Sequence, residues 1–261
     1  MPHSSDENTA LVDRAVHDSA VALRTVLESM ERLDADALRA PSALPGWSRG
    51  HVLAHIDGAG NAAARQAEAV ARGERVEFYD GGRQGRDTAI EAQAGRTLEE
   101  HAEALTRLAA RLDAAWPERG SELWDQPTSY RDKPLSGVAL MWWREVRIHL
   151  VDLQVSVSPG SWDDDLCRHL LDFLSPRLSG AGRTDLVADG TERPWPVNDD
   201  ARAAGSDGVL TVRGELRDIA AWLAGREPET LPAAARAGQP QPLPELGPWP
   251  TVSERPRPRG D

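Results

Sequence analysis

Apolar residues recur every three or four positions in four long stretches of the first 155 residues. This spacing places them on one face of a helix, so each stretch predicts an amphipathic helix with one buried stripe. Ser48 precedes the second stretch, and Thr97 opens a Thr-x-x-Glu capping box before the third, as is typical of helix starts. The predicted helices cover residues 6–33, 48–70, 97–116 and 136–155.

Helices of this length favour an antiparallel bundle that buries the four apolar stripes together. Residues 73–96 carry no such stripe and are predicted to form a loop between the second and third helices. A loop of this length is longer than a simple helical hairpin needs, and long loops in compact domains commonly serve a function.

The pattern changes towards the second half of the chain. A short helix is predicted over residues 164–178, followed by short strands at 185–189 and 208–213 and a helix over 215–225. From Glu227 onward nine of the nineteen prolines accumulate, which predicts an extended and partly disordered tail.

The fold class that follows is α+β, with two domains. Residues 1–180 are expected to form the helical bundle, and residues 181–261 a small α+β domain that ends in the proline-rich tail. No internal repeat is visible in the sequence.

Composition and charge narrow the classes of function. The longest uncharged runs, residues 134–143 and 153–162, are much shorter than the roughly 20 apolar residues of a membrane span. The first ten residues are polar and lack the basic and apolar segments of a secretory signal, so we expect a cytoplasmic protein. A net charge of −12 and the lack of a long basic run argue against nucleic acid as a partner.

Cysteine usage limits the kinds of metal site. Cys167 is the single cysteine, which excludes an intrachain disulfide framework and the zinc motifs built from several cysteines. Its position in an amphipathic segment favours a role as a small core residue. Any bound metal would therefore need histidine and carboxylate ligands.

Two of the predicted helices each carry a pair of candidate ligands. His51 and His55 lie four residues apart on the second helix, and Glu145 and His149 lie four apart on the fourth. Facing helices of a bundle can bring such pairs together around zinc, iron or nickel, with zinc as the commonest redox-silent choice. The alternative is that each pair is a surface feature or a satisfied polar group in the core.

Four segments resemble a known family. Residues 44–56 (LPGWSRGHVLAHI) and 144–153 (REVRIHLVDL) are similar to the mycothiol-dependent maleylpyruvate isomerases, which belong to the DinB-like metal-binding four-helix bundles. Gly214-Glu-Leu and residues 221–226 (AWLAGR) resemble the small C-terminal domain of that family. The likeness extends over nearly the whole chain.

The resemblance implies a set of site residues. It maps the metal ligands onto His55, Glu145 and His149, and leaves His51 as a neighbour of the metal, a proton relay or a surface residue. Arg226 matches a position that resembles a substrate or cofactor clamp; the alternative is an arginine that complements the dipole at the end of its helix. Arg86 aligns with another such position, and its alternative is a solvated charge in a loop.

Two further residues near the proposed ligands have open roles. Asp152, on roughly the same helix face as Glu145, would either orient a ligand or support the bundle. Arg147 stands where relatives often carry an apolar residue, and if it lined the pocket the substrate would differ from maleylpyruvate.

The activity implied by the resemblance is a zinc- and mycothiol-dependent isomerisation of maleylpyruvate to fumarylpyruvate, or of a related unsaturated acid. A thiolate would add to the double bond, the bond would rotate, and elimination would release the trans product. One alternative is a mycothiol S-transferase that conjugates the thiol to an electrophile. Another class of function is a metal-binding bundle without enzymatic activity.

Overall fold

The computed structural model describes residues 5–191, 193–198 and 208–250. Contacts between residues divide the chain into two compact units, Met1–Val157 and Ser158–Asp261. This division falls earlier than the boundary expected at residue 180. The reason is the packing of α7 (Asp164–Leu174), whose buried leucines lie against α8 (Leu216–Leu223) of the second unit.

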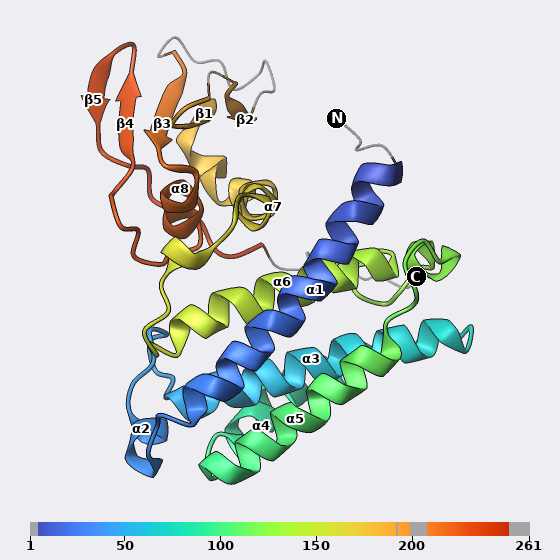
Figure 1. The fold of residues 1–261 in the computed structure, drawn as a ribbon. Coiled ribbons are helices and arrows are strands. Elements are labelled where there is room, and N and C mark those ends of the chain that lie inside the picture. The colour runs from blue at the N-terminus through green and yellow to red at the C-terminus, as the bar shows by residue number, and fades with distance from the viewer. Residues whose placement is uncertain (1–4, 192, 199–207, 251–261) are drawn as a thin grey trace, which may run out of the picture. The chain divides into compact units, whose positions relative to one another are not determined.

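Four long helices form the first unit and confirm the predicted elements. In Figure 1, α1 packs against α6, α6 against α3, α3 against α5, and α5 against α1, so that the four stripes enclose one core. Within the described ranges, no helix is both long and apolar enough to cross a membrane. The bounds are α1 (Ser5–Met30), α3 (Arg49–Ala71), α5 (Leu98–Ala115) and α6 (Leu135–Asp152).

Side-chain caps define where α3 and α5 begin. The Ser48 hydroxyl accepts from the backbone N–H of His51, and the imidazole of His51 accepts in return from the backbone N–H of Ser48. Thr97 and Glu100 make the same reciprocal pair at the start of α5. These caps satisfy N–H groups that have no partner inside the helix, which explains why the sequence predicts both starts.

One glycine allows α3 to approach its neighbours closely. A Cβ atom at Gly60 would lie 2.6 Å from Leu108 Cδ2 of α5 and 3.0 Å from the Trp142 ring of α6. A larger residue here would force the Leu108 side chain to shift and would crowd the Trp142 ring at the centre of the core.

Two α-helices and one 3₁₀ helix of the first unit were not predicted. The segment 73–96, expected to be a loop, contains α4 (Gly82–Gln93), which packs against α3. Its sequence contains two glycines. Among the described residues of this helix, Ile90 is the one buried side chain, so the sequence shows no apolar stripe from which a helix could be predicted. The short helix α2 (Ala35–Arg39) is capped by Asp34, and the 3₁₀ helix η1 spans Glu122–Asp125.

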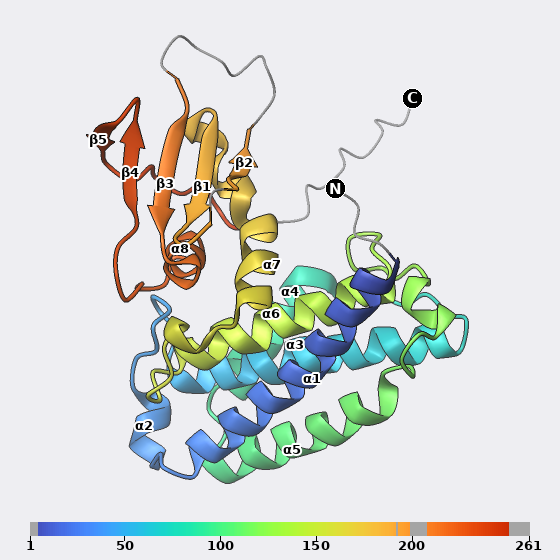
Figure 2. The same cartoon turned by 45° about the horizontal axis from the view of Figure 1, so that its top comes forward.

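The second unit is a five-stranded sheet covered by helices (Figure 2). The strand order is β2-β1-β3-β4-β5, in which β1 and β3 are parallel and the other neighbours antiparallel. Helix α8 packs on β1 and β3, and the 3₁₀ helices η2 (Pro159–Ser161) and η3 (Ser175–Ala181) flank α7 in the sequence. The strands are β1 (Thr184–Ala188), β2 (Trp195–Val197), β3 (Leu210–Gly214), β4 (Ala233–Arg236) and β5 (Gln239–Gln241).

The proline-rich tail is more ordered than the sequence indicates. Strands β4 and β5 form a hairpin within the segment that was expected to be extended and partly disordered. Pro240 is accommodated because β5 is the edge strand, where one side of the backbone needs no partner. The last part of the predicted tail, residues 251–261, lies outside the described residues.

Candidate metal centre

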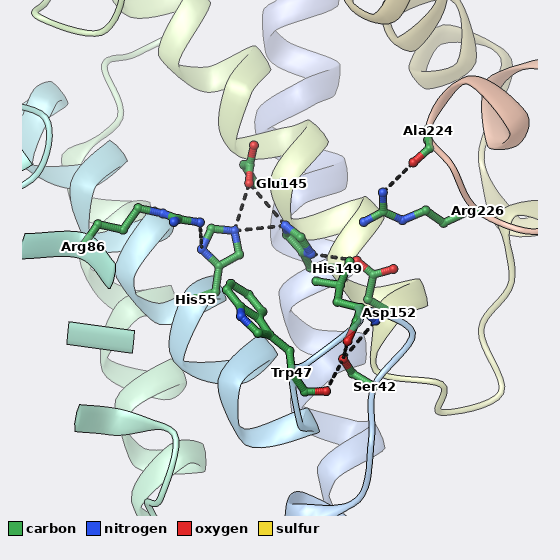
Figure 3. A network of polar contacts seen from close by, with 10 residues as sticks. Ser42, Trp47, His55, Arg86, Glu145, His149, Asp152, Ala224 and Arg226 are labelled. Carbon is green, nitrogen blue, oxygen red and sulfur yellow. Dashed lines mark hydrogen bonds and ion pairs between the residues drawn. The ribbon is translucent and has the colours of Figure 1, made fainter. Parts of the chain in front are cut away.

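His55, Glu145 and His149 come together in the helical unit. Nε2 of His55 lies 3.0 Å from Nε2 of His149 and 3.1 Å from Oε2 of Glu145, and the remaining pair is 3.4 Å apart (Figure 3). His55 projects from α3, whereas Glu145 and His149 project from adjacent turns of α6. The i,i+4 pairs that the sequence indicated therefore meet, with one residue from the first pair and both from the second.

The spacing of these three atoms suits a small divalent cation. Zinc–ligand distances of about 2.0–2.1 Å in a tetrahedron place neighbouring ligand atoms about 3.3 Å apart. The three observed distances of 3.0, 3.1 and 3.4 Å bracket that value. Two imidazoles and a carboxylate are also the ligand types of catalytic zinc sites, so the residues fit zinc, one of the three metals that the sequence left open.

Asp152 fixes the orientation of His149. Its Oδ2 accepts from Nδ1 of His149 at 2.8 Å, and the carboxylate is completely buried. This bond keeps a proton on Nδ1 and directs Nε2 towards Glu145 and His55. Of the two roles that the sequence left open for Asp152, the structure favours the orientation of a ligand.

Burial and hydrogen bonding set the charges of His55 and Glu145. Burial lowers the pKa of His55 to about 4, helped by the neighbouring His149, so His55 is neutral and able to bind a metal. Burial alone would raise the pKa of Glu145, but hydrogen bonds from His149 and His55 outweigh it and hold that pKa well below its usual range. The site therefore presents an anionic carboxylate beside a neutral imidazole.

Trp47 shields one side of the site. Its ring lies edge-on to His55 with centroids 5.6 Å apart, and its carbonyl accepts from the hydroxyl of Ser42. The packing leaves 3% of His55 exposed. The turn before α3, which contains Trp47, thus limits the access of water to His55.

Arg86 lies beside His55, at its Nδ1 atom. Its Nη2 is 3.3 Å from Nδ1 of His55, and its Nη1 donates to Asp87 at 2.6 Å. The guanidinium also lies 6.0 Å from the centroid of the Tyr79 ring. The structure thus brings Arg86 directly to a candidate ligand.

Tyr79 is a neighbour of the site that the sequence analysis did not identify. Burial raises the pKa of its hydroxyl strongly, and the negative charge of Glu145 adds to that rise. The signal in the sequence was the aromatic pair Phe78-Tyr79 inside an otherwise polar segment.

His51 and Arg147 have structural contacts of their own. Nδ1 of His51 belongs to the cap of α3, and its Nε2 lies 3.5 Å from Glu91. Arg147 points to the face of α6 opposite the ligands, where its Nε is 3.3 Å from Asp18 of α1. The hypothesis that Arg147 lines the pocket is therefore not supported by its placement.

The two remaining candidate residues belong to the second unit. Cys167 is 1% exposed in α7, which agrees with a core role. Arg226 follows α8; its Nη1 donates to the carbonyl of Ala224 at 2.5 Å (Figure 3), and its guanidinium lies 5.4 Å from the centroid of the Trp249 ring. Arg177 stacks on the same ring at 5.6 Å. Trp249 thus holds two guanidinium groups close together.

His101, elsewhere in the bundle, is expected to make stability depend on pH. The side chain is completely buried on α5, and burial together with the charge of Arg96 lowers its pKa to about 4. The unfolded chain, with a pKa near 6.5, takes up a proton that the folded chain resists, so the free energy of unfolding falls as the pH drops below about 6.5. Between about pH 7.5 and pH 5 the loss should be about 2 kcal/mol.

Denaturant unfolding of wild type and His101→Leu at several pH values checks this expectation. The variant should gain that amount relative to wild type as the pH falls, whereas the exposed His17→Leu serves as the control for loss of an imidazole. A stability difference between wild type and His101→Leu that stays constant with pH would refute the assignment.

Comparisons with known proteins identify the family of this chain. A sequence model described as the mycothiol maleylpyruvate isomerase N-terminal domain matches residues 16–154, more than half of the chain and a range that contains all three triad residues. No curated protein matches the sequence.

Two solved structures share the fold. A crystal structure of the mycothiol-dependent maleylpyruvate isomerase aligns with a TM-score of 0.74 and 21% identity, covering 94% of this chain and 96% of that one. A histidine-to-alanine mutant of the isomerase aligns with a TM-score of 0.73, at the same identity and coverage. Because that sequence model covers more than half of the chain, this chain belongs to the mycothiol maleylpyruvate isomerase N-terminal domain family.

Proposed function

We propose that this protein is a zinc- and mycothiol-dependent isomerase that converts maleylpyruvate, or a related cis-unsaturated acid, to its trans isomer. The observation that carries the proposal is the convergence of His55, Glu145 and His149 in a chain of this family. The similar solved structures are of a mycothiol-dependent maleylpyruvate isomerase, which supports the reaction type.

Each residue of the triad would have a defined part in holding the metal. Neutral His55 and the His149 ring oriented by Asp152 would donate through Nε2, and Glu145 would supply the negative charge. When bound, a zinc ion would lower the pKa of a thiol and so provide a thiolate at neutral pH. Mycothiol would supply that thiol, which adds reversibly to the conjugated double bond so that rotation can follow.

The surroundings of the triad favour such chemistry. Trp47 and the helix packing keep water from His55, which strengthens electrostatic interactions at the site. Arg86, 3.3 Å from His55, would offer a cation to a substrate carboxylate or to the negative charge of an enolate.

Arg226 is proposed to hold a substrate carboxylate, which predicts a specific cost for its replacement. Arg226→Lys keeps the charge but loses the planar pair of N–H donors, and Arg226→Ala loses both. Each change should lower kcat/KM by about one to two powers of ten, or about 1.5–3 kcal/mol, while the metal content stays at the wild-type level.

The measurement is kcat/KM together with metal content and a melting curve. Arg213→Lys, an exposed arginine of β3 in the same unit, is the matched control and should behave as wild type. Wild-type kinetics in both Arg226 variants would mean that this arginine contributes only to the end of α8. Loss of bound metal or of the folded state would mean that its role is structural.

The source of the thiol is tested by Cys167. Since Cys167 is buried in α7, Cys167→Ser should retain activity, whereas omission of mycothiol should abolish it. The assay loads the protein with zinc, adds mycothiol and maleylpyruvate, and follows the trans product; generic electrophiles are tried in parallel.

Three results of that assay would redirect the proposal. Loss of activity in a folded Cys167→Ser protein would make the thiol internal and remove mycothiol from the mechanism. Accumulation of a stable thiol conjugate without trans product would identify an S-transferase. Turnover of neither class of substrate by the metal-loaded protein would favour a metal-binding bundle without enzymatic activity.

A further inference from the structure

The chain that follows β5 is attached to the second unit at Gly247. The backbone N–H of Gly247 donates to the carbonyl of Arg177 at 2.8 Å, and Nε of Arg177 donates in return to the carbonyl of Gly247 at 2.8 Å. The two backbones approach closely, because a Cβ atom at Gly247 would lie 3.2 Å from the carbonyl oxygen of Arg177. This reciprocal pair of hydrogen bonds fixes the chain two residues before Trp249.

Trp249 then packs among three side chains of the same unit. Its ring lies 6.3 Å from the Phe173 ring of α7, measured between centroids. The guanidinium groups of Arg177 and Arg226 lie 5.6 Å and 5.4 Å from the centroid of its ring. Both distances are within the reach of about 6 Å over which the face of an aromatic ring attracts a cation. The half-buried indole thus attracts both arginines.

The end of α8 holds the same two guanidinium groups. Nη1 of Arg177 donates to the carbonyl of Leu223, and Nη1 of Arg226 donates to the carbonyl of Ala224 at 2.5 Å (Figure 3). The last carbonyls of a helix have no partner inside it and carry a partial negative charge, so they attract cations. The two arginines nevertheless repel each other, and burial together with the charge of Arg226 lowers the pKa of Arg177. The indole and the helix end therefore keep together two charges that would otherwise separate.

We propose that Trp249 positions the guanidinium of Arg226 for the substrate carboxylate, and that the bonds between Arg177 and Gly247 hold Trp249 in place. This inference rests on the proposed function, in which Arg226 binds that carboxylate. A free arginine side chain has many conformations, and a ring beside its guanidinium together with a carbonyl on Nη1 leaves it few. A planar fork that is already oriented binds a carboxylate more tightly, because less conformational entropy is lost on binding.

Two substitutions at Trp249 distinguish positioning from plain packing. Trp249→Phe keeps an aromatic face for the guanidinium, whereas Trp249→Leu keeps an apolar side chain without such a face. In Trp249→Leu, kcat/KM should fall about threefold to tenfold, mainly through a higher KM, and in Trp249→Phe it should stay within about twofold of wild type. The matched control is Trp195→Leu, which removes a half-buried indole that donates to Asp172 in the same unit. This control should have wild-type kinetics.

A double-mutant cycle assigns the effect to Arg226. In Arg226→Ala the guanidinium that Trp249 orients is absent, so the addition of Trp249→Leu should change kcat/KM by less than about twofold. A general weakening of the second unit would instead lower kcat/KM in both backgrounds. Melting curves and metal content verify that each variant is folded and loaded. Should Trp249→Leu fail to fold, Trp249→Met also replaces the ring by an apolar chain and should show the same losses.

NMR of protein labelled at arginine follows the position of Arg226 without an assay of activity. Protons close to the face of an indole have shifted resonances, and the signals that disappear in Arg177→Lys and in Arg226→Lys identify the two arginines. In Trp249→Leu the side-chain resonances of Arg226 should move to the values of an exposed arginine. In Trp195→Leu they should stay where they are in wild type.

The outcomes separate this inference from the proposed function. If Arg226→Ala loses activity but Trp249→Leu keeps wild-type kinetics or an unchanged Arg226 resonance, the inference is overturned and the proposed function stands. Equal losses in Trp249→Leu and Trp249→Phe, or a further loss in the Arg226→Ala background, would also overturn it, since packing alone explains them. If wild type has no isomerase activity, or Arg226→Ala keeps wild-type kinetics, the proposed role of Arg226 fails and this inference fails with it.

Discussion

Replacing any one of the three converging residues, as His55→Ala, Glu145→Gln or His149→Ala, is expected to remove the bound metal. Their ligand atoms lie 3.0–3.4 Å apart, so the loss of one leaves two ligands and an open cluster that holds zinc weakly. Without the metal, the thiol is protonated for the most part at neutral pH, and kcat/KM should fall by at least about a hundredfold.

Metal analysis of the purified variants and their kinetics provide the measurement. His51→Ala is the matched control, because it removes a histidine one turn away on the same helix that belongs to the cap of α3. It should keep its metal and lose some stability. Wild-type metal content in all three triad variants would overturn the assignment of the ligands.

Asp152→Asn is expected to weaken metal binding by about tenfold to a hundredfold while the protein stays folded. The carboxylate accepts from Nδ1 of His149 at 2.8 Å in a fully buried position, and so raises the electron density on the metal-facing nitrogen. A neutral amide of the same size accepts this bond less strongly and can present an N–H to the ring instead.

Competition of each protein with a metal chelator gives the affinity. Asp18→Asn is the matched control, since Asp18 accepts from Trp143 and lies beside Arg147 on the opposite side of α6. That variant should keep the metal affinity of wild type and change stability alone. Equal affinities for Asp152→Asn and Asp18→Asn would show that the Asp152 bond supports the bundle and has no influence on the metal.

Local features of the sequence were sufficient for most of the helical unit. The caps at Ser48 and Thr97 act within one turn, and the apolar stripes depend on the periodicity of a single helix, so neither needs knowledge of the rest of the fold. Helix α4 was missed for the converse reason. Its glycines and polar residues form a helix because α3 offers a surface for Ile90, a contact between distant segments.

Some strands were predicted from local sequence, and others depend on the tertiary structure. The sequence indicated β1 and β3, which have buried apolar residues, but not β2, β4 and β5, which are short and lie toward the edges. An edge strand such as Gln239–Gln241 has no hydrophobic pattern of its own and forms because β4 provides a hydrogen-bonding partner.

For the candidate site, too, some features follow from the sequence and others from the tertiary structure. By itself the sequence determined which side chains share a helix face, and hence that Glu145 and His149 project together, because the i,i+4 geometry belongs to every α-helix. The family resemblance added His55 to this pair, and the structure brings the three together. Tertiary structure alone decided that Arg86 lies beside His55 and that Arg147 faces Asp18. The rotation of each helix about its axis is set by packing against helices far away in the chain, which no local pattern encodes.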